Sequence, residues 1–372
     1  MTLSNRYLDH WPETRDRFMR WWRREPTDRP LIRITAPRER PLDDSPVPPE
    51  LPAPQKYLDA EYRIGRWRHY FNNTWFGGDA FPVCMADLGP GSLALYLGAK
   101  PGFGASTIWF EPAVSSLETG ALPEFNAQSE WFQTHLELLR RIHDAFGDTA
   151  YTAIPDLVES TDIVSALRGP SEFLYDLTDH PADCHRWLKR INDLYPPHYD
   201  AFYNLLKDRE GGSAFTVFAL WSPGKTAKIQ CDFAAMISPE MFGEFYIPYA
   251  KQQIETLDYV MYHLDGPSCI GHVDQLIALE KLNCIQWIPG AGHPQQHDEQ
   301  WFPLYRKILD GGKGLQVSLK ADKVVDFVKR FGSRGVYILT STKTEAEGRE
   351  LMKAITSCGT PCLKPLSERN TP

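Results

Sequence analysis

Residues 259–342 contain four short β-rich runs in succession: YVMYHLDG (259–266), CIQWIPG (284–290), GLQVSL (314–319) and GVYILTST (335–342). Helical patterns separate these runs, and the last run leads into the amphipathic segment AEGRELMKAI. Strands that alternate with helices in this way are typical of repeated βα units around a parallel sheet. The stretch therefore predicts an α/β fold.

The same alternation continues toward the N-terminus. Four further strand candidates are TAYTAIPDL (149–157), SAFTVFALW (213–221), KIQCDFA (228–234) and PVCMADLG (82–89). Eight strands with intervening helices and no visible reversal of order predict an (β/α)8 TIM barrel with an N-terminal helical extension. We expect residues 81–358 to form the barrel, residues 1–80 to pack on it as an extension, and residues 359–372 to form a C-terminal tail.

Helix signals support the spacing between the strands. Ser238-Pro239-Glu240 is typical of a helix start, since serine caps the free N–H groups and proline suits the first helical position. Pro248 lies ten residues further on, where it should kink the helix that begins there.

Composition excludes several classes of protein. The net charge is −8 and no stripe of Lys and Arg is present, which argues against a nucleic-acid partner. No run of 18 apolar residues exists, so no membrane partner is expected, and the N-terminus resembles neither a signal nor a transit peptide, so we expect a cytoplasmic location. The seven cysteines lack the spacing of a disulfide framework, and Cys358 and Cys362 are interpreted as unpaired thiols.

Strand alternation selects the candidate site. Polar side chains near the C-terminal ends of parallel barrel strands face the active-site mouth. His263 and Asp265 are two residues apart and share a face, and in KIQCDFA the same rule selects Asp232 and places Cys231 among the core thiols. Applied to the other strands, the rule selects a further set of residues: Asp87, Asp156, Gln286, Ser318, Lys320 and either Thr340 or Ser341.

Four carboxylates, those of Asp87, Asp156, Asp232 and Asp265, would thus meet one imidazole, that of His263. Such a group cannot stay ionised in a closed cavity without a cation or shared protons. A divalent metal ion, a cationic substrate or substrate hydroxyl groups would each satisfy it. Any one of the aspartates could instead cap the helix that follows its strand.

Three ring-bearing residues, Trp221, Trp287 and His293, are further candidates for substrate binding. Trp287 and His293 belong to QWIPGAGHP (286–294), a glycine-rich segment at the same end of the barrel, where an indole could stack on a substrate ring. Both tryptophans could equally fill the core, and His293 could be an uninvolved loop residue.

At these residues the chain resembles the uroporphyrinogen decarboxylase-like superfamily, which includes corrinoid-dependent methyltransferases. The resemblance rests on three stretches besides the His263 strand: FMRWWRREPTDRPLIRI (18–34), DIVSALRGPSEFLYDLTDHP (162–181) and DFAAMISPEMFGEFYIPYAKQQIE (232–255). It implies the same barrel, a small-molecule substrate and a corrinoid, if one is used, that is carried by a partner protein.

The chain departs from this superfamily at its metal ligands. The zinc methyltransferases carry a His-any-Cys pair where this chain has His263-Leu264-Asp265, and a further cysteine after the last strand, where this chain has TSTKT. A thiolate site is absent, although histidine with carboxylates can still hold zinc or another divalent metal. The arginine-rich N-terminal loop of true uroporphyrinogen decarboxylases is also missing, and an acidic mouth would repel a porphyrinogen.

Three functions follow as hypotheses. The first is methyl or other one-carbon transfer from a small substrate, with His263 and Asp265 holding a divalent metal as Lewis acid. The second is a metal-free decarboxylase or lyase in which Asp232 or Asp156 stabilises a cation and His263 moves a proton. The third is a protein that binds a sugar or another polar ligand without catalysis. The sequence leaves the oligomeric state open.

Overall fold

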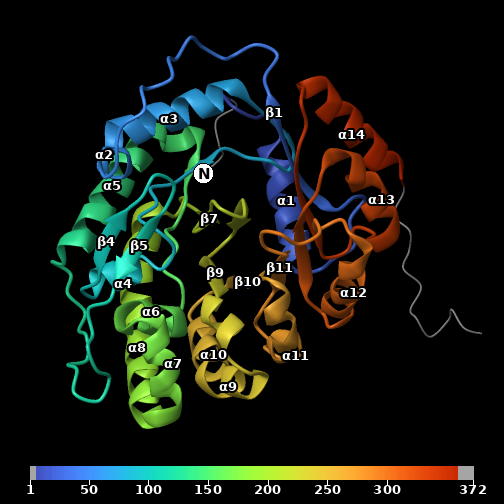
Figure 1. Ribbon diagram of the computed structural model, residues 1–372. Helices are drawn as coiled ribbons and strands as arrows, with labels where there is room; N and C mark the ends of the chain where they lie inside the picture. The colour runs from blue at the N-terminus through green and yellow to red at the C-terminus, as the bar shows by residue number, and fades with distance from the viewer. Residues whose placement is uncertain (1–5, 359–372) are drawn as a thin grey trace, which may run out of the picture.

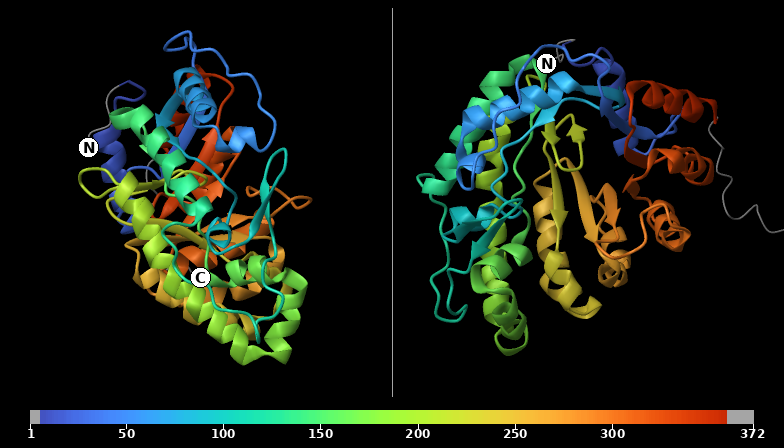
Figure 2. Two further views of the ribbon diagram at one scale, coloured as in Figure 1. Left: turned by 90° about the vertical axis from the view of Figure 1, so that its left-hand side faces the viewer. Right: turned by 45° about the horizontal axis from the view of Figure 1, so that its top comes forward.

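The structure is a computed structural model, and it describes residues 6–358. Its centre is a seven-stranded sheet with the strand order β2-β1-β13-β12-β11-β10-β9. Every neighbouring pair is parallel except β1 and β2, which are antiparallel. Helices surround the strands in Figures 1 and 2, so the α/β class is confirmed. The hydrogen-bonded ladder of the described residues ends at β2 and β9, so these strands do not form one closed ladder.

The strands are short, and three pairs lie outside the main sheet: β3 with β6, β4 with β5, and β7 with β8. The strand bounds are β1 Leu31–Pro37, β2 Thr74–Gly78, β3 Val83–Cys84, β4 Lys100–Phe103, β5 Ile108–Glu111, β6 Tyr151–Thr152, β7 Ser213–Phe215, β8 Leu220–Ser222, β9 Thr226–Gln230, β10 Tyr259–Asp265, β11 Cys284–Ile288, β12 Gly314–Ser318 and β13 Val336–Ser341.

The helices lie between the strands along the chain. The α-helix bounds are α1 Trp11–Trp22, α2 Gln55–Leu58, α3 Ala60–Asn73, α4 Leu93–Tyr96, α5 Glu130–Phe146, α6 Ser160–Arg168, α7 Pro170–Asp179, α8 Pro181–Leu206, α9 Pro239–Phe245, α10 Ile247–Glu255, α11 Val273–Ile277, α12 Phe302–Asp310, α13 Ala321–Phe331 and α14 Glu345–Ser357. Four short 3-10 helices are η1 Gly147–Thr149, η2 Asp232–Met236, η3 Pro267–His272 and η4 Glu299–Trp301. No helix of residues 6–358 is long and apolar enough to cross a membrane.

Local signals explain the α9–α10 pair. The Ser238 hydroxyl accepts a hydrogen bond from the backbone N–H of Met241 and Pro239 opens α9, which confirms the predicted helix start. The kink predicted at Pro248 is a full break: α9 ends at Phe245, Tyr246 departs from regular helical geometry with a φ of −119°, and Pro248 lies in the first turn of the separate helix α10.

Strand registers define the interior face of the sheet. His263 on β10 is paired with Gln230 on β9 and with Gln286 on β11. Gln286 is paired in turn with Gln316 on β12. Side chains in register point to the same side of a sheet, so these four form one polar row across the interior.

The predicted strand 213–221 is wrong, because this segment is the antiparallel hairpin β7–β8. Its apolar run is interrupted by a turn in which Ala219 adopts a φ of 49° and the side chain of Val217 is exposed. Strand periodicity does not reveal such a turn, since a left-handed residue is normally glycine or asparagine.

Strand β1 occupies a place that the sequence did not predict. It pairs in parallel with β13, the last strand of the chain, from Leu31–Tyr337 to Thr35–Ser341. Residues 31–37 and 74–78, within the range expected to pack on the barrel, are therefore strands of the central sheet. The alternation of Ile32 and Ile34 with Arg33 and Thr35 is a local strand signal, but the partner strand β13 lies about 300 residues away, and this pairing leaves no local trace in the sequence.

An aromatic cluster fills one end of the interior. The indole of Trp11 on α1 lies 5.3 Å from the ring of Phe81, 5.4 Å from Tyr151 and 5.5 Å from Trp221, measured between ring centroids. Phe18 on the same helix packs on Phe81, and the cluster includes β7 and β8. Helix α1 thus closes this end with large side chains, and leaves the opposite end of the strands open.

Candidate functional site

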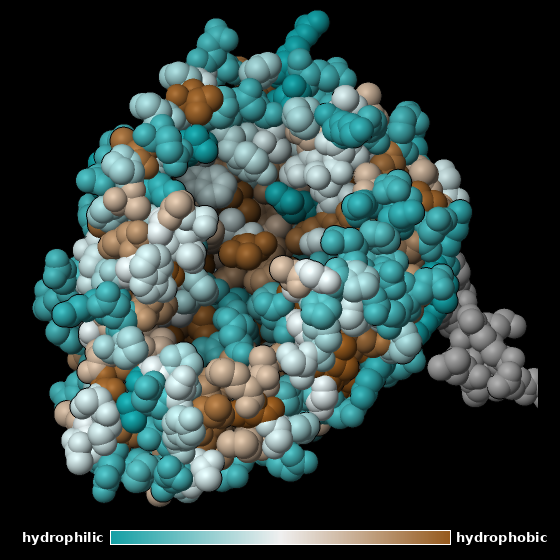
Figure 3. Space-filling model, in the orientation of Figure 1, coloured by the Kyte–Doolittle hydropathy of each residue, from teal (hydrophilic) through white to brown (hydrophobic). Residues whose placement is uncertain are grey.

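A cavity of about 310 Å³ lies at the C-terminal ends of the strands, and four predicted residues border it. Asp87 follows β3, Asp156 follows β6, Asp232 follows β9 and His263 lies on β10. The space-filling view shows a hollow in the middle of the face turned toward the viewer, where hydrophobic and hydrophilic side chains meet (Figure 3). The remaining wall is made by Met85, Ala86, Pro90, Ile154, Pro155, Phe215, Thr216, Val217, Phe218, Lys228 and Gln230.

The tautomer of His263 follows from its partner Gln286. The side-chain amide nitrogen of Gln286 donates to the backbone carbonyl of Trp287 at 3.0 Å, which orients the amide and turns its oxygen Oε1 toward His263. Nδ1 of His263 therefore donates to that oxygen. A neutral His263 then carries its lone pair on Nε2, which can accept a proton or a hydrogen bond.

His263 is neutral at pH 7 in this environment. Burial and then the nearby ammonium group of Lys228 lower the pKa of His263 below its usual 6.5, and the side-chain oxygen of Gln286 opposes them. The ring of Phe218 lies 5.1 Å away and covers one side of the imidazole. His263 therefore suits a base or a hydrogen-bond acceptor, not a cation.

A buried lysine crosses the cavity wall. The Lys228 side chain is 2% exposed, and its Nζ lies 2.7 Å from Oδ2 of Asp156. The same Nζ donates to Oε1 of Gln230, whose amide nitrogen donates to Asp232 at 3.0 Å. A continuous polar chain thus joins Asp156 to Asp232, while Oδ1 of Asp156 is buried without a protein partner in the described part of the chain.

Asp232 titrates near neutrality. The Asp232 side chain is exposed at the cavity mouth, but the surrounding protein still desolvates it, and this effect, followed by the neighbouring carboxylate of Asp162, raises the pKa of Asp232 to about 7, although Lys228 acts in the opposite direction. Asp162 is held on the other side, where its carboxylate accepts the backbone N–H groups of Asp232 at 2.9 Å and Phe233 at 3.0 Å. Asp232 can therefore donate a proton at pH 7.

Asp87 is the third carboxylate of the cavity. Burial raises the pKa of Asp87, against the backbone N–H of Gly89, which donates to it at 2.8 Å. Arg63 on α3 contributes positive charge nearby and donates to the Asp87 carbonyl at 2.7 Å. Asp87 thus lines the cavity and also accepts a backbone N–H in the loop after β3, which is a turn contact and not the helix cap considered for these aspartates.

Asp265 stands at the edge of the site. Its side chain is 48% exposed, and its Oδ2 lies 3.9 Å from Nε2 of His263, too far for a hydrogen bond. Among residues 6–358, no third His, Cys, Asp or Glu side chain joins this pair as a compact ligand group. Structural and catalytic zinc sites use three or four protein ligands, so this pair does not fit zinc by itself.

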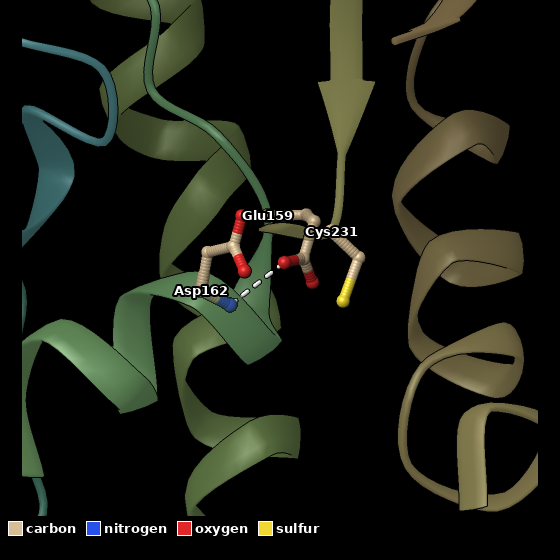
Figure 4. A group of neighbouring side chains, drawn as sticks. All are labelled: Glu159, Asp162 and Cys231. Atoms are coloured by element: carbon tan, nitrogen blue, oxygen red, sulfur yellow. Dashed lines mark hydrogen bonds between the residues drawn. The ribbon is translucent and has the colours of Figure 1, made fainter. Parts of the chain in front are cut away.

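A different trio forms a compact group of possible ligands beside the cavity. Donor atoms of Glu159, Asp162 and Cys231 lie within 4.8 Å of one another (Figure 4). Glu159, however, accepts the N–H groups of Thr161 at 2.6 Å and Asp162 at 2.7 Å as the cap of α6. Burial raises the pKa of Glu159 and of Cys231 well above their usual values, which keeps the thiol protonated and disfavours a charged carboxylate. We assign the trio a structural role.

Four predicted substrate-binding residues lie away from the cavity. Trp221 is fully buried in the aromatic cluster around α1, at the closed end. Trp287 alternates with Gln286 and therefore faces the helices, where it packs 5.1 Å from Trp301. His293 is exposed in the loop after β11.

Thr340 departs from the prediction for a similar reason. It shares a strand face with Ile338, which packs in the helical layer of the core, while Leu339 and Ser341 take the other face. Thr340 borders a different hollow, together with Ser318, Lys320 and Ser341. These residues therefore do not join His263.

Some residues that make up the site were not among the predicted site residues. Lys228 and Gln230 border the cavity, and both share a strand face with Asp232 in KIQCDFA, so the alternation that selected Asp232 could have selected them. Asp162 and Phe218 carry no such signal, because one lies in the first turn of α6 and the other in the β7–β8 turn.

Comparison with known proteins adds a fold relationship. No protein-family model matches the chain, and no curated protein matches it. Among solved structures, a methyltransferase from Methanosarcina mazei is similar in fold, with a TM-score of 0.60 over 92% of this chain and 98% of that chain. The sequences are 12% identical, so this similarity concerns the fold alone.

Proposed function

We propose that this protein is an enzyme that transfers a methyl group from a small substrate bound in the cavity. The observation that carries the proposal is that Asp232 and His263, a possible proton donor and a possible proton acceptor, line the same cavity. Asp232, with a pKa of about 7, can hold a proton, and His263 is a neutral acceptor. The fold similarity to a methyltransferase supports the reaction class.

The chemistry assigned to these residues is acid catalysis of methyl transfer. When a methyl group leaves a neutral ether, amine or thioether atom of the substrate, that atom keeps the bonding electron pair and needs a proton. Asp232 would donate this proton, and Nε2 of His263 would accept a hydrogen bond from a polar group that orients the substrate. The methyl group passes to a nucleophile from outside the chain, for which a corrinoid on a partner protein is our proposal.

The buried pair Lys228–Asp156 would set the charge of the cavity. The ammonium group lowers the pKa of His263 and opposes the rise at Asp232. The unpaired Oδ1 of Asp156 offers an acceptor for a substrate N–H or O–H group. A neutral or cationic substrate atom therefore fits this side of the mouth.

A metal ion on His263 and Asp265 would have two protein ligands only. The Glu159, Asp162 and Cys231 group is compact, but both carboxyl groups accept backbone N–H groups and the buried Cys231 thiol is protonated. His263 and Asp265 therefore do not fit a zinc ion without a further ligand, and no catalytic step is assigned to a metal.

The proposal also concerns the closed barrel and the superfamily. We infer that β1, β3, β6, β9, β10, β11, β12 and β13 are the eight strands of a (β/α)8 barrel. In support, β2 fills the gap beside β1, and the hairpin strand β7 lies between β6 and β9, bonded from Ile154 N–H to Ala214 carbonyl at 2.9 Å. On this basis we propose a divergent member of the uroporphyrinogen decarboxylase-like superfamily.

The test uses the purified full chain with a panel of O-, N- and S-methylated small molecules and reduced cobalamin as the methyl acceptor. NMR should show loss of the substrate methyl signal and gain of methylcobalamin. D232N should slow transfer by about 10²-fold or more, as expected for loss of a general acid. Release of carbon dioxide without methyl transfer would instead support a decarboxylase, and stabilisation by sugars without product would support a binding protein.

A further inference from the structure

A second cavity, of about 440 Å³, lies beside the first and has a different chemical character. Its wall includes Trp67 and Tyr70 from α3, Phe76 from β2, and Thr216 from the β7–β8 turn. Thr216 borders both cavities, so one turn separates them. A volume of this size accommodates a small organic ligand.

Two arginines give this cavity positive charge. Arg33 projects from β1 and Arg66 from α3, and both border the cavity. Nη2 of Arg33 donates to the hydroxyl of Tyr70 at 3.3 Å, and Arg66 is exposed. No carboxylate of residues 6–358 forms an ion pair with either guanidinium group. Two cations without a protein counter-ion next to an apolar wall are a site for an organic anion.

The rings form a fixed apolar wall. Trp67 and Tyr70 pack edge to face at 5.8 Å and 79°, and Tyr70 and Phe76 at 6.3 Å and 86°. The indole N–H of Trp67 donates to the Met85 carbonyl at 2.9 Å, which fixes its plane. A rigid aromatic wall favours a flat ring, since little side-chain freedom is lost when the ligand binds.

We propose that this second cavity binds an aromatic carboxylate, with Arg33 and Arg66 holding the carboxylate and the aromatic wall holding the ring. Resting on the proposed function, the inference places the carboxylate end of the methyl donor here and its reacting end beyond Thr216, near Asp232 and His263. The mouth then has a basic side and an acidic side, which suits a substrate that is anionic at one end only.

A carboxylate fits better than a phosphate here. A guanidinium group matches the two coplanar oxygens of a carboxylate, and the wall is apolar. Arg33 also borders the hollow next to Thr340, where Lys320 and Lys343 lie together with the carboxylates of Asp322 and Glu347. Inorganic phosphate in the binding experiment tests the alternative ligand.

The experiment measures binding of benzoate to the full chain by calorimetry and ligand-observed NMR, with benzamide as the neutral probe. We expect saturable benzoate binding that benzamide does not show. R33Q and R66Q should each weaken it about tenfold or more, as for loss of a charged hydrogen bond. The matched control is R68Q, since Arg68 is an exposed residue of the same helix that does not border the cavity.

Four results would overturn the inference: no saturable binding of benzoate, equal binding of benzamide, unchanged affinity in R66Q, or displacement of benzoate by equimolar phosphate. Arg66 is exposed, so R66Q keeps the test open even where R33Q disturbs folding. The experiment measures benzoate binding and does not depend on turnover. Failure to bind benzoate therefore leaves methyl transfer intact, and failure of methyl transfer leaves the carboxylate site intact.

Discussion

The side-chain oxygen of Gln286 accepts the Nδ1 proton of His263, and this hydrogen bond fixes which imidazole nitrogen faces the cavity. Q286L removes the acceptor and lets the ring change tautomer. We expect kcat to fall about tenfold or more, with little change in KM. Nitrogen-15 NMR of His263 should show mixed tautomers in Q286L. Q275L, at a site on α11 outside the cavity, is the control, and unchanged kcat in Q286L would refute the positioning role.

Activity should depend on pH through Asp232 and His263. The active form has Asp232 protonated and His263 neutral, so kcat/KM should fall as pH rises through about 7. The value of kcat/KM should also fall at acid pH, below the usual histidine pKa of 6.5, where His263 takes up a proton. D232N should abolish the alkaline limb. If the alkaline limb persisted unchanged in D232N, another group would be responsible for it.

The free energy of unfolding should also depend on pH through Asp232, and the raised pKa sets the direction of that dependence. The pKa of Asp232 is raised in the folded state to about 7, so the folded protein binds more protons than the unfolded chain between about pH 4 and pH 7. The contribution of Asp232 to the free energy of unfolding therefore falls as pH rises across this range and is constant above it. D232N should be more stable than the native protein at pH 8, and equally stable at pH 3. Denaturant titrations at both pH values measure this.

Lys228 and Asp156 should be coupled in stability. K228M leaves the Asp156 carboxylate without its cation, and we expect a loss of about 3 kcal/mol in the free energy of unfolding. D156N in the K228M background should recover part of that loss. Urea denaturation of both single variants and the double variant gives the coupling, and strictly additive losses would mean that the pair does not interact.

The aromatic cluster should dominate stability at the closed end. Trp11 is 2% exposed and contacts three rings, so W11A should lower the free energy of unfolding by about 3–5 kcal/mol. Trp109 is 53% exposed, and W109A should change it by less than about 0.5 kcal/mol. Similar losses in both variants, measured by denaturation, would contradict the assignment of the core.

Metal content can be measured directly. With two protein ligands at His263 and Asp265, protein purified without chelator should contain less than one equivalent of zinc, and H263A should not change that content. Stoichiometric zinc that is lost in H263A would restore the metal-assisted mechanism. Zinc lost in C231S alone would assign it to the Glu159 group instead.

Strand positions and the residues at strand ends could be predicted from the sequence where the structure repeats locally. Strand alternation found β9 to β13, and it brought Asp87, Asp156, Asp232 and His263 to one cavity, because parallel strands end at a common edge. Alternation also explains the position of Trp287, which was selected from its loop and not from its strand parity.

What the sequence missed depends on contacts between distant segments. The pairing of β1 with β13 and the packing of Trp221 under α1 are set by the closure of the chain on itself. The turn that interrupts 213–221 follows from Ala219, whose strained backbone is stabilised by its tertiary surroundings. Local propensity contains no information on any of these.

The β7–β8 turn joins two parts of the molecule that would otherwise be independent. Gln316 donates to the Phe218 carbonyl at 2.8 Å and Tyr337 to the Ala219 carbonyl at 2.7 Å, which anchors the turn to the strands beneath it. Phe218 belongs to the aromatic cluster and also covers His263. A substitution deep among the tryptophans can therefore reshape the ligand cavity without touching it, so changes in substrate preference during evolution can begin far from the mouth.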